Sequence, residues 1–526
     1  MGFRLRKGAA NADDQASKGA FGHELESVLP NDSIPWYKKK HLIILNFYCV
    51  SISLLSAANG YDGSMMNGLM TLPQWFDFME NPKGSWLGFI NGVLALVSTI
   101  SFPLVAYFAN RWGRKKGLLV GYFFIFVGSF LQAFTPNKEG FITARALLGF
   151  CSSWWGGLVP LLITELAYPT HRPFLTSLYN CGFYVGSITA AWVTFGTRNY
   201  DSDWAWRIPS LLQIVIPAVA LPTVLLIPES PRFLISKGKA NEAREILTKL
   251  HAGGDQNSEL IDFEIPEIER AIEADNINQN SSSWGDLFST KGNRHRAFIS
   301  ITLGVFAQWN GVGVVSYYLA LVLQTVGITS VTQQTLISGC LQIWNLFWAV
   351  IAAASVDILG RRKLFLISSI GMLCSYIVIT ALSGTFAVGG NASVGLAVIP
   401  FLYIFYGFYD IAFTPLVFAY PAEIWSYNLR ARGIALTQLS TYLALFFNIF
   451  VNPIALDAIA WKYYIVYVVI LVVIVLTIFF FYPETKGHTL EEMAIIFDGS
   501  EQAIVADSAT DKSKTVGETY HNESKE

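Results

Sequence analysis

Two carboxylates in this sequence stand inside long apolar runs, where a charge is costly. Asp62 lies in the stretch GYDGSMMNG, residues 60–68, which interrupts a mostly apolar run that begins near His41. A charge in apolar surroundings needs a partner, and Arg145, inside a later apolar run, is the natural cation. A carboxylate held in this way can respond to an incoming proton. A second interpretation stays open, in which Asp62 is a helix-end carboxylate that faces water.

The other carboxylate, Asp410, lies midway along a run near the carboxyl-terminal end of the chain. Polar groups in such positions are either functional or hydrogen bonded between helices. Three roles therefore stay open for Asp410: a ligand-binding residue, a second protonatable group, or a residue paired with a neighbouring helix.

The elements that must position these residues follow from the composition. Of the 526 residues, 53% are hydrophobic and only 14% are charged, which is typical of a membrane protein. A membrane-spanning helix needs about 20 apolar residues, whereas a spanning β-strand needs about ten that alternate. The chain holds about twelve runs of the helical kind, near residues 42–69, 87–109, 117–135, 141–165, 174–196, 207–227, 297–324, 334–356, 363–385, 395–421, 433–455 and 462–482.

We therefore predict an all-α integral membrane protein of twelve transmembrane helices in two pseudo-symmetric six-helix bundles. Lys and Arg gather in the amino-terminal tail and in the second and eighth loops, which predicts that both termini are cytoplasmic. Residues 229–296 are then a cytoplasmic linker with short surface helices. Two roles stay open for this linker: a solvated connection between the bundles, or a site for a regulatory partner. The predicted segments are a tail over 1–41, a bundle over 42–228, the linker over 229–296, a bundle over 297–482 and a tail over 483–526.

The two predicted bundles repeat one another in their charged loops. Gly113-Arg114-Lys115 after the second run matches Gly360-Arg361-Arg362 after the eighth, and a Glu and an Arg recur seven residues apart after the fourth and tenth runs. Such groups at helix ends can pair and bias an equilibrium between two conformations. The predicted charge latch contains Arg114, Glu165, Arg172, Glu229, Arg232, Asp357, Arg361, Glu423, Arg430 and Glu484.

These motifs resemble those of the sugar porter family of the major facilitator superfamily over roughly residues 40–495. The resemblance also rests on PESPR at residues 228–232 and PETKG at residues 483–487. Asn110 departs from the pattern, since the family has Asp there. Within the family, segments such as LHAGGD at residues 250–255 and YDIAFTP at residues 409–415 look like the fungal lactose and cellodextrin transporter branch.

The resemblance implies roles for residues in the spans. Proton-coupled members carry an Asp and an Arg at the positions of Asp62 and Arg145. Sugar binding needs amides, hydroxyls and an aromatic face, and the positions that match, together with nearby candidates, are Asn180, Gln308, Asn345, Phe418, Thr441, Asn448 and Asp410. Ala307 and Gly313 stand where the family has amides, which favours a larger or different solute. For any single amide, interhelical hydrogen bonding is the alternative.

We therefore expect a plasma-membrane transporter that imports a disaccharide or hexose with protons by alternating access. An uncoupled facilitator of a sugar or polyol and a non-transporting nutrient sensor are the alternatives. We expect no enzyme activity, cofactor, metal or nucleic-acid partner, and a functional monomer in the lipid bilayer. Asn391 begins an N-glycosylation sequon in a predicted outward loop, and the tail after Glu492 has the composition of a disordered segment.

Overall fold

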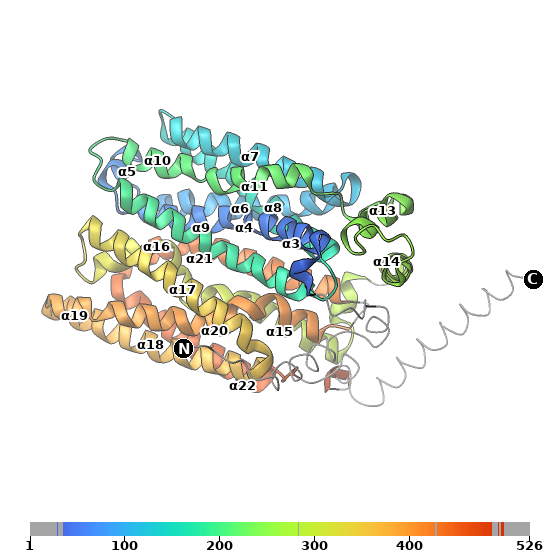
Figure 1. Ribbon diagram of the computed structural model, residues 1–526. Helices are drawn as coiled ribbons and strands as arrows, with labels where there is room; N and C mark the ends of the chain where they lie inside the picture. Colours follow the sequence, from blue (N-terminus) through green and yellow to red (C-terminus); the bar gives the residue numbers. More distant parts are fainter. Residues whose placement is uncertain are drawn as a thin grey trace, which may run out of the picture.

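The computed structural model describes residues 29, 35–281, 283–426, 429–486, 493 and 496–498. The elements of these residues are α-helices and short 3-10 helices. Figure 1 shows that the long helices form two bundles, one from each half of the chain, packed side by side. Helices satisfy every backbone hydrogen bond internally, so apolar runs of this length fold as helices in a membrane.

The first half contains α3 to α11. Their bounds are α3 Lys40–Ser53, α4 Ser56–Leu69, α5 Pro73–Phe78, α6 Gly84–Trp112, α7 Arg114–Phe134, α8 Lys138–Leu166, α9 Arg172–Thr197, α10 Trp204–Leu212 and α11 Val215–Leu226. The second half contains α15 to α22. Their bounds are α15 Lys291–Trp309, α16 Val312–Thr325, α17 Val331–Leu359, α18 Arg361–Gly389, α19 Ala392–Leu396, α20 Val398–Ile424, α21 Arg430–Ile459 and α22 Tyr463–Phe481, with η3 Ala460–Lys462 between the last two.

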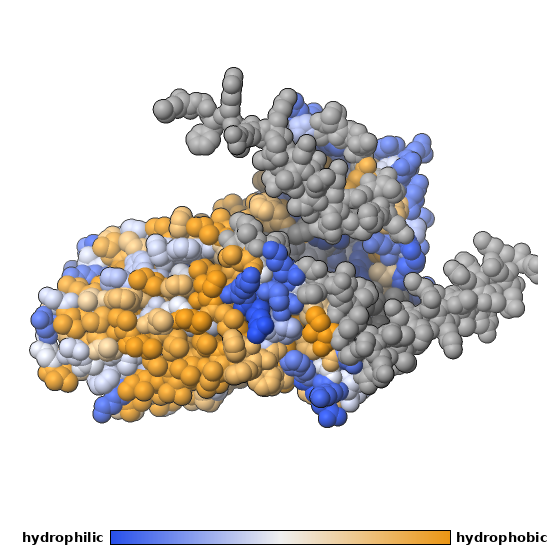
Figure 2. Space-filling view, turned by 90° about the horizontal axis from the view of Figure 1, so that it is seen from below, coloured by the Kyte–Doolittle hydropathy of each residue, from blue (hydrophilic) through white to orange (hydrophobic). Residues whose placement is uncertain are grey.

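Ten stretches of the described residues are long and apolar enough to cross a membrane. The last of them, Arg430–Phe481, holds the two helices α21 and α22. The 26-residue α9 lies between the fourth and fifth stretches. With α9 and with the last stretch taken as its two helices, the described chain has the twelve crossings that the sequence predicts. Figure 2 shows hydrophobic side chains over the broad side of the molecule and hydrophilic ones toward its ends, as a membrane requires.

Three helices of the connecting segment lie beyond one end of the bundles. They are α12 Pro231–Ser236, α13 Ala240–Leu250 and α14 Glu259–Ser281, and a short turn of 3-10 helix, η2 Trp284–Phe288, leads from them to α15. Figure 1 shows α13 and α14 at this end and α5 and α19 at the opposite end. We call these the linker end and the far end.

The first span of each half is broken. In the first half the break is a turn at Leu54–Leu55, between α3 and α4. In the second half it lies at Asn310–Gly311, where Gly311 has a φ of +98°, and Tyr318 further along has non-helical angles. The sixth span of the first half is also interrupted, at Gln213–Ile214 between α10 and α11, whereas α22 is continuous.

Helices α4 and α9 pack with their backbones in direct contact. A Cβ added to Gly60 would collide with the carbonyl oxygen of Phe183, and one added to Gly186 would collide with that of Ala57. Ser187 donates a hydrogen bond of 3.0 Å from its hydroxyl to the carbonyl of Gly60. Small residues permit this approach between membrane helices, so the helix with Asp62 is joined closely to α9.

Contacts between the halves lie from the middle of the bundles to the far end. Asn67 of α4 donates from its amide to the carbonyl of Ser316 and accepts from the backbone N–H of Leu319 at 2.9 Å. Arg198 donates to the hydroxyl of Thr332 at 3.0 Å. The far end is therefore closed in this conformation.

Candidate functional site

Asp62 and Arg145 form a buried ion pair in the first half. Arg145 Nη1 lies 3.0 Å from Oδ1 and 3.3 Å from Oδ2 of Asp62, and the two residues are 3% and 8% exposed. The other guanidinium nitrogens donate to the carbonyl oxygens of Ile90 at 2.8 Å and Asn91 at 3.3 Å. A planar guanidinium suits this arrangement because its donors are fixed in a fork. The pair keeps both charges satisfied inside the bundle.

The position of Asp62 differs from the helix-end alternative. Asp62 lies in the middle of the continuous helix α4, and the break in this span lies earlier, at Leu54–Leu55. The ring of Tyr317, from the second half, lies close by, 3.5 Å from the position of a Cβ on Gly63. Asp62 thus stands beside the boundary between the halves.

Asp410 lies at the middle of α20 and is fully buried. Its Oδ1 accepts hydrogen bonds from the hydroxyl of Tyr184 in α9, at 2.5 Å, and from that of Thr414, at 2.8 Å. Its Oδ2 is buried without a hydrogen-bond partner among the described residues. The carboxylate therefore joins the two halves through Tyr184 and keeps one acceptor available.

The amides predicted to contact substrate are arranged unequally. Asn345 of α17 is 1% exposed and its Oδ1 has no partner within the described part of the chain. The amide of Asn448 donates to the backbone oxygen of Gln308. The Thr441 hydroxyl donates within its own helix, to the carbonyl of Thr437 at 2.8 Å. Of these groups, Asn345 keeps an unoccupied buried acceptor.

Asn448 also explains a departure from the family pattern. A Cβ added to Gly313 would lie 2.7 Å from Asn448 Nδ2, so the amide of Asn448 stands where a side chain at position 313 would begin. The space that Gly313 leaves open is thereby filled by an amide from α21. Asn452, Tyr463 and Tyr467 stand behind it, with both tyrosine hydroxyls donating to Asn452 Oδ1 at 2.9 and 2.7 Å.

The side chains of Asn180 and Phe418 lie outside the described residues, as does that of Asp357 in the predicted latch. The backbone places Asn180 in α9 and Phe418 in α20, the two helices that Tyr184 and Asp410 join.

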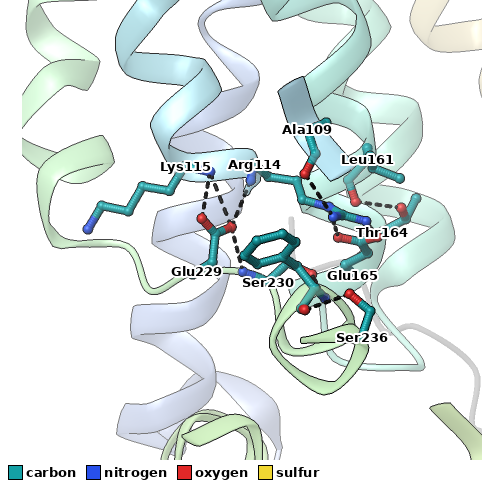
Figure 3. A network of polar contacts seen from close by, with 10 residues as sticks. Ala109, Arg114, Lys115, Leu161, Thr164, Glu165, Glu229, Ser230 and Ser236 are labelled. Carbon is teal, nitrogen blue, oxygen red and sulfur yellow. Dashed lines mark hydrogen bonds and ion pairs between the residues drawn. The ribbon is translucent and has the colours of Figure 1, made fainter. Parts of the chain in front are cut away.

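The latch of the first half is assembled at the linker end (Figure 3). Arg114 donates from Nη2 and Nε to the Glu165 carboxylate at 2.9 and 3.0 Å. Glu229 accepts the backbone N–H groups of Arg114 and Lys115 at 3.0 and 3.2 Å, at the start of α7. A carboxylate is favoured at a helix amino terminus because the first N–H groups have no partner within the helix. Gly113 has a φ of +101°, and a Cβ there would collide with Glu229.

The second half repeats this geometry. Arg361 donates to Glu423 at 2.8 and 3.1 Å, and Glu484 accepts the backbone N–H groups of Arg361 and Arg362 at 2.8 and 3.2 Å. Burial acts to raise the pKa of Glu484, but the backbone N–H groups of Lys486, Arg361, Arg362 and Thr485 together hold that pKa below its ordinary value.

Each of these pairs lies inside one half of the molecule. Arg114 and Glu165 join α7 to α8, and Arg361 and Glu423 join α18 to α20. Of the remaining latch residues, Arg172 is exposed at the start of α9, Arg232 lies in the first turn of α12 and Arg430 begins α21. The two pairs are formed here while the far end is closed.

Comparisons with known proteins agree with this architecture. The model of the family described as "Sugar (and other) transporter" matches residues 48–497, which is most of the chain. The chain belongs to this sugar transporter family. It is a multi-pass sugar transporter of the major facilitator superfamily and not an enzyme.

Relatives and solved structures of the family are similar over most of their length. The MFS-type transporter oryC of Aspergillus oryzae is 27% identical, over 82% of each chain, and the low-affinity glucose transporter HXT3 of Saccharomyces cerevisiae is 26% identical, over 91% of this chain and 86% of its own. The inward open conformation of the xylose transporter XylE from E. coli superposes with a TM-score of 0.71 at 22% identity, over 86% of this chain and 100% of its own. This likeness shows a shared fold.

Three polar contacts in this protein were not predicted from the sequence. Tyr184, Asn67 and His251 are polar residues whose partners come from distant helices. Tyr184 stands one helical turn beyond Asn180, and Asn67 lies in the same quoted stretch as Asp62. Tyr184 therefore lies on a helix face that the sequence had already indicated, and Asn67 lies close in sequence to Asp62 but on another face, and tyrosine and asparagine in spans are too common to mark a contact by themselves.

Proposed function

We propose that this protein imports a sugar together with protons across the plasma membrane, by alternating exposure of a central site. The buried pair of Asp62 and Arg145 carries the proposal. Protonation of Asp62 would remove its charge, while Arg145 would keep the carbonyls of Ile90 and Asn91 as partners. The event would therefore loosen α4 from α8 and leave the charge of Arg145 unbalanced but still hydrogen bonded, which favours a change to a conformation that exposes it.

The substrate is a disaccharide or a hexose in this proposal. Asn345 and Asp410 each offer a buried acceptor with no partner among the described residues, at the middle of the bundles. Sugar hydroxyls are donors that match such acceptors. The resemblance to the fungal lactose and cellodextrin branch favours a disaccharide, while the relatives named as glucose transporters favour a hexose.

The linker end is cytoplasmic in this proposal, and both termini with it. The support is the excess of Lys and Arg in the loops at that end, among them Arg114 and Lys115. The charge latch then lies on the cytoplasmic side, and the far end, closed here, faces outward. Asn391 caps α19 at the far end with an exposed side chain that accepts from the backbone of Ser393, which suits a glycosylation acceptor. The functional unit is a monomer.

The test is uptake of labelled sugars in cells that lack their own sugar carriers. Glucose, galactose, xylose, lactose and cellobiose are compared with and without a protonophore. Accumulation above the external concentration, abolished by the protonophore, is the expected result. Uptake that the protonophore does not change would favour an uncoupled facilitator. No uptake of any sugar, despite surface expression, would favour a sensor.

A matched pair of variants tests whether Asp62 is the residue that couples protons to sugar transport. Asp62→Asn is expected to lose accumulation while it still exchanges labelled for unlabelled sugar, since the neutral amide mimics the protonated acid. Asp77→Asn, which changes an exposed carboxylate in α5, is expected to accumulate sugar normally. Unchanged accumulation by Asp62→Asn would remove that residue from proton coupling.

A further inference from the structure

The imidazole of His251 links the connecting segment to the end of α8. His251 directly follows α13 and is buried, with Nδ1 2.8 Å from Glu264 Oε2 of α14 and Nε2 3.1 Å from the carbonyl oxygen of Leu166. Leu166 is the last residue of α8 and directly follows the latch residue Glu165. The last carbonyls of a helix have no N–H partner within it, so a donor there stabilises the helix end.

A second buried side chain, that of Arg296, makes the same kind of contact at the end of α20. Arg296 of α15 is 1% exposed and donates from Nε to the carbonyl oxygen of Ile424 at 2.9 Å. Ile424 is the last residue of α20 and directly follows the latch residue Glu423. Arg296 also pairs with Asp498 at 2.8 Å, and its Cζ lies 4.6 Å from the ring centroid of Phe497. At these positions the prediction of a disordered tail is wrong.

The ends of α8 and α20 therefore carry the same three-part unit, which we call the helix-end clamp. Each clamp consists of a buried nitrogen-bearing side chain, a carboxylate partner and the carbonyl oxygen of the residue after a latch glutamate. We propose that His251 and Arg296 are positioning residues of the transport cycle, which hold Glu165 and Glu423 in place, and that the His251 clamp alone responds to pH.

The two clamps differ in their response to pH because histidine and arginine differ in their acid–base chemistry. Both ring nitrogens of His251 face acceptors, and only the protonated imidazolium can donate to both, because the neutral ring carries a single N–H. Histidine changes charge between about pH 5 and 8, whereas arginine keeps its charge. Loss of the proton leaves one buried acceptor of the His251 clamp without its donor, which weakens the clamp.

The inference rests on the proposed function for its physiological meaning. With the linker end in the cytoplasm, protons imported with sugar would acidify the compartment that His251 faces. The clamp would tighten, α8 would hold its latch glutamate more firmly, and transport would slow. The device would act as feedback from the imported proton on the carrier.

Other titratable and charged groups near His251 must be distinguished from it as causes of a pH dependence. By element, they are Glu264 from α14, Glu165 and Arg114 from α8 and α7, Tyr168 and His171 from the segment before α9, and His41 from α3. The Tyr168 ring lies 5.5 Å from that of His251 and 5.6 Å from that of His171. Burial lowers the pKa of His171. His41→Gln and His171→Gln are therefore necessary controls.

The test is hydrogen–deuterium exchange of the full-length protein in lipid nanodiscs at pH 6 and pH 8, corrected for the intrinsic pH dependence of exchange. In the wild type, we expect α13 to exchange at least threefold more slowly at pH 6 than at pH 8. His251→Gln should exchange fast at both values. Arg296→Lys should loosen the start of α15 and leave the pH dependence of α13 intact, as should the two histidine controls.

Exchange requires no transport, so this result is independent of whether protons are coupled to sugar. Glu264→Gln serves as a second variant if His251→Gln does not fold, and it should reduce the pH dependence because its amide no longer attracts the imidazolium charge. Equal corrected exchange at both pH values in the wild type, or a pH dependence that survives in both variants, would overturn the proposal.

Discussion

Tyr184 of α9 and Asp410 of α20, each midway along its helix, are joined by a 2.5 Å hydrogen bond that crosses from one half of the transporter to the other. The bond lies among the contacts between the halves that extend from here to the far end. Any movement that separates α9 from α20 must break it. The residue pair is thus placed to influence which conformation prevails.

Replacing Tyr184 with Phe tests this bond. The change removes one of the two described donors to the buried Oδ1 of Asp410 and leaves Thr414 as the other, and the loss of a hydrogen bond to a buried carboxyl group costs about 1–3 kcal/mol. We expect a melting temperature lower by several degrees and sugar uptake reduced about tenfold. Tyr179→Phe is the matched control on the same helix, since its hydroxyl lies 3.5 Å from the Trp155 carbonyl, at the limit of hydrogen bonding. Equal effects of both variants would contradict a special role for Tyr184.

Removal of the Asn67 side chain should open the far end. Asn67→Ala loses both bonds to the broken helix α16, each worth about 1 kcal/mol, so the ratio of open to closed forms should rise roughly tenfold or more. The measurement is labelling by a membrane-impermeant thiol reagent of a cysteine placed at Val315, in a background without the five native cysteines. Gln74→Ala is the control, because that amide bonds the Tyr200 carbonyl within one half. Unchanged labelling of Asn67→Ala would show that other contacts keep the far end closed.

Arg145 should not tolerate replacement by lysine. A lysine ammonium is a compact charge that cannot reach the carboxylate and the two carbonyls that the guanidinium holds at once. We expect Arg145→Lys to lower uptake at least tenfold, equivalent to about 1.4 kcal/mol. Arg244→Lys, at an exposed pair with Asp262 in the connecting segment, should transport nearly as well as the wild type. Similar uptake by both variants would mean that only the charge of Arg145 matters.

A comparison of substitutions at Gly113 and Gly254 distinguishes the cost of backbone strain from the cost of a steric collision. Both have a φ near +100°, where a side chain costs about 1–3 kcal/mol. A Cβ at Gly113 would also strike the Glu229 carboxylate that caps α7, whereas Gly254 faces open space. Gly113→Ala should therefore lose clearly more thermal stability than Gly254→Ala. Equal melting temperatures would show that Glu229 moves aside without cost.

Glu484 should stabilise the protein in a pH-dependent way. Because the folded state lowers its pKa, its contribution is fully present above the ordinary value near 4.5 and is lost as the pH falls below it. The difference in melting temperature between the wild type and Glu484→Gln should thus be constant from pH 5 to 8 and shrink at lower pH. A difference that stays constant down to pH 3.5 would assign the effect to shape and not to charge.

The sequence was informative where physics leaves few choices. A carboxylate and a guanidinium inside apolar helices must find partners, so Asp62 and Arg145 could be matched before the fold was known. The charged loops gave the repeat, because motifs about 250 residues apart share spacing and residue type. The number and length of the apolar runs predicted the membrane-spanning helices.

Partners that depend on how two bundles meet could not be predicted in this way. Tyr184 reaches Asp410, and Asn448 fills the space beside Gly313, only because helices from distant parts of the chain adopt one particular packing. His251 belongs to the segment LHAGGD that resembles the family branch, yet its carbonyl partner on α8 is a feature of tertiary structure. Asn180, Phe418 and Asp357 stay predictions.

The backbone contact between α4 and α9 has a mechanical consequence. With Gly60 against Phe183 and Gly186 against Ala57, these helices cannot slide past each other without a steric collision. Asp62 on α4 and Tyr184 on α9 therefore move together as parts of one rigid unit. If Asp62 binds a proton, as proposed, the change would then reach Asp410 on the opposite bundle through the rigid packing of α4 against α9 and the hydrogen bond of Tyr184.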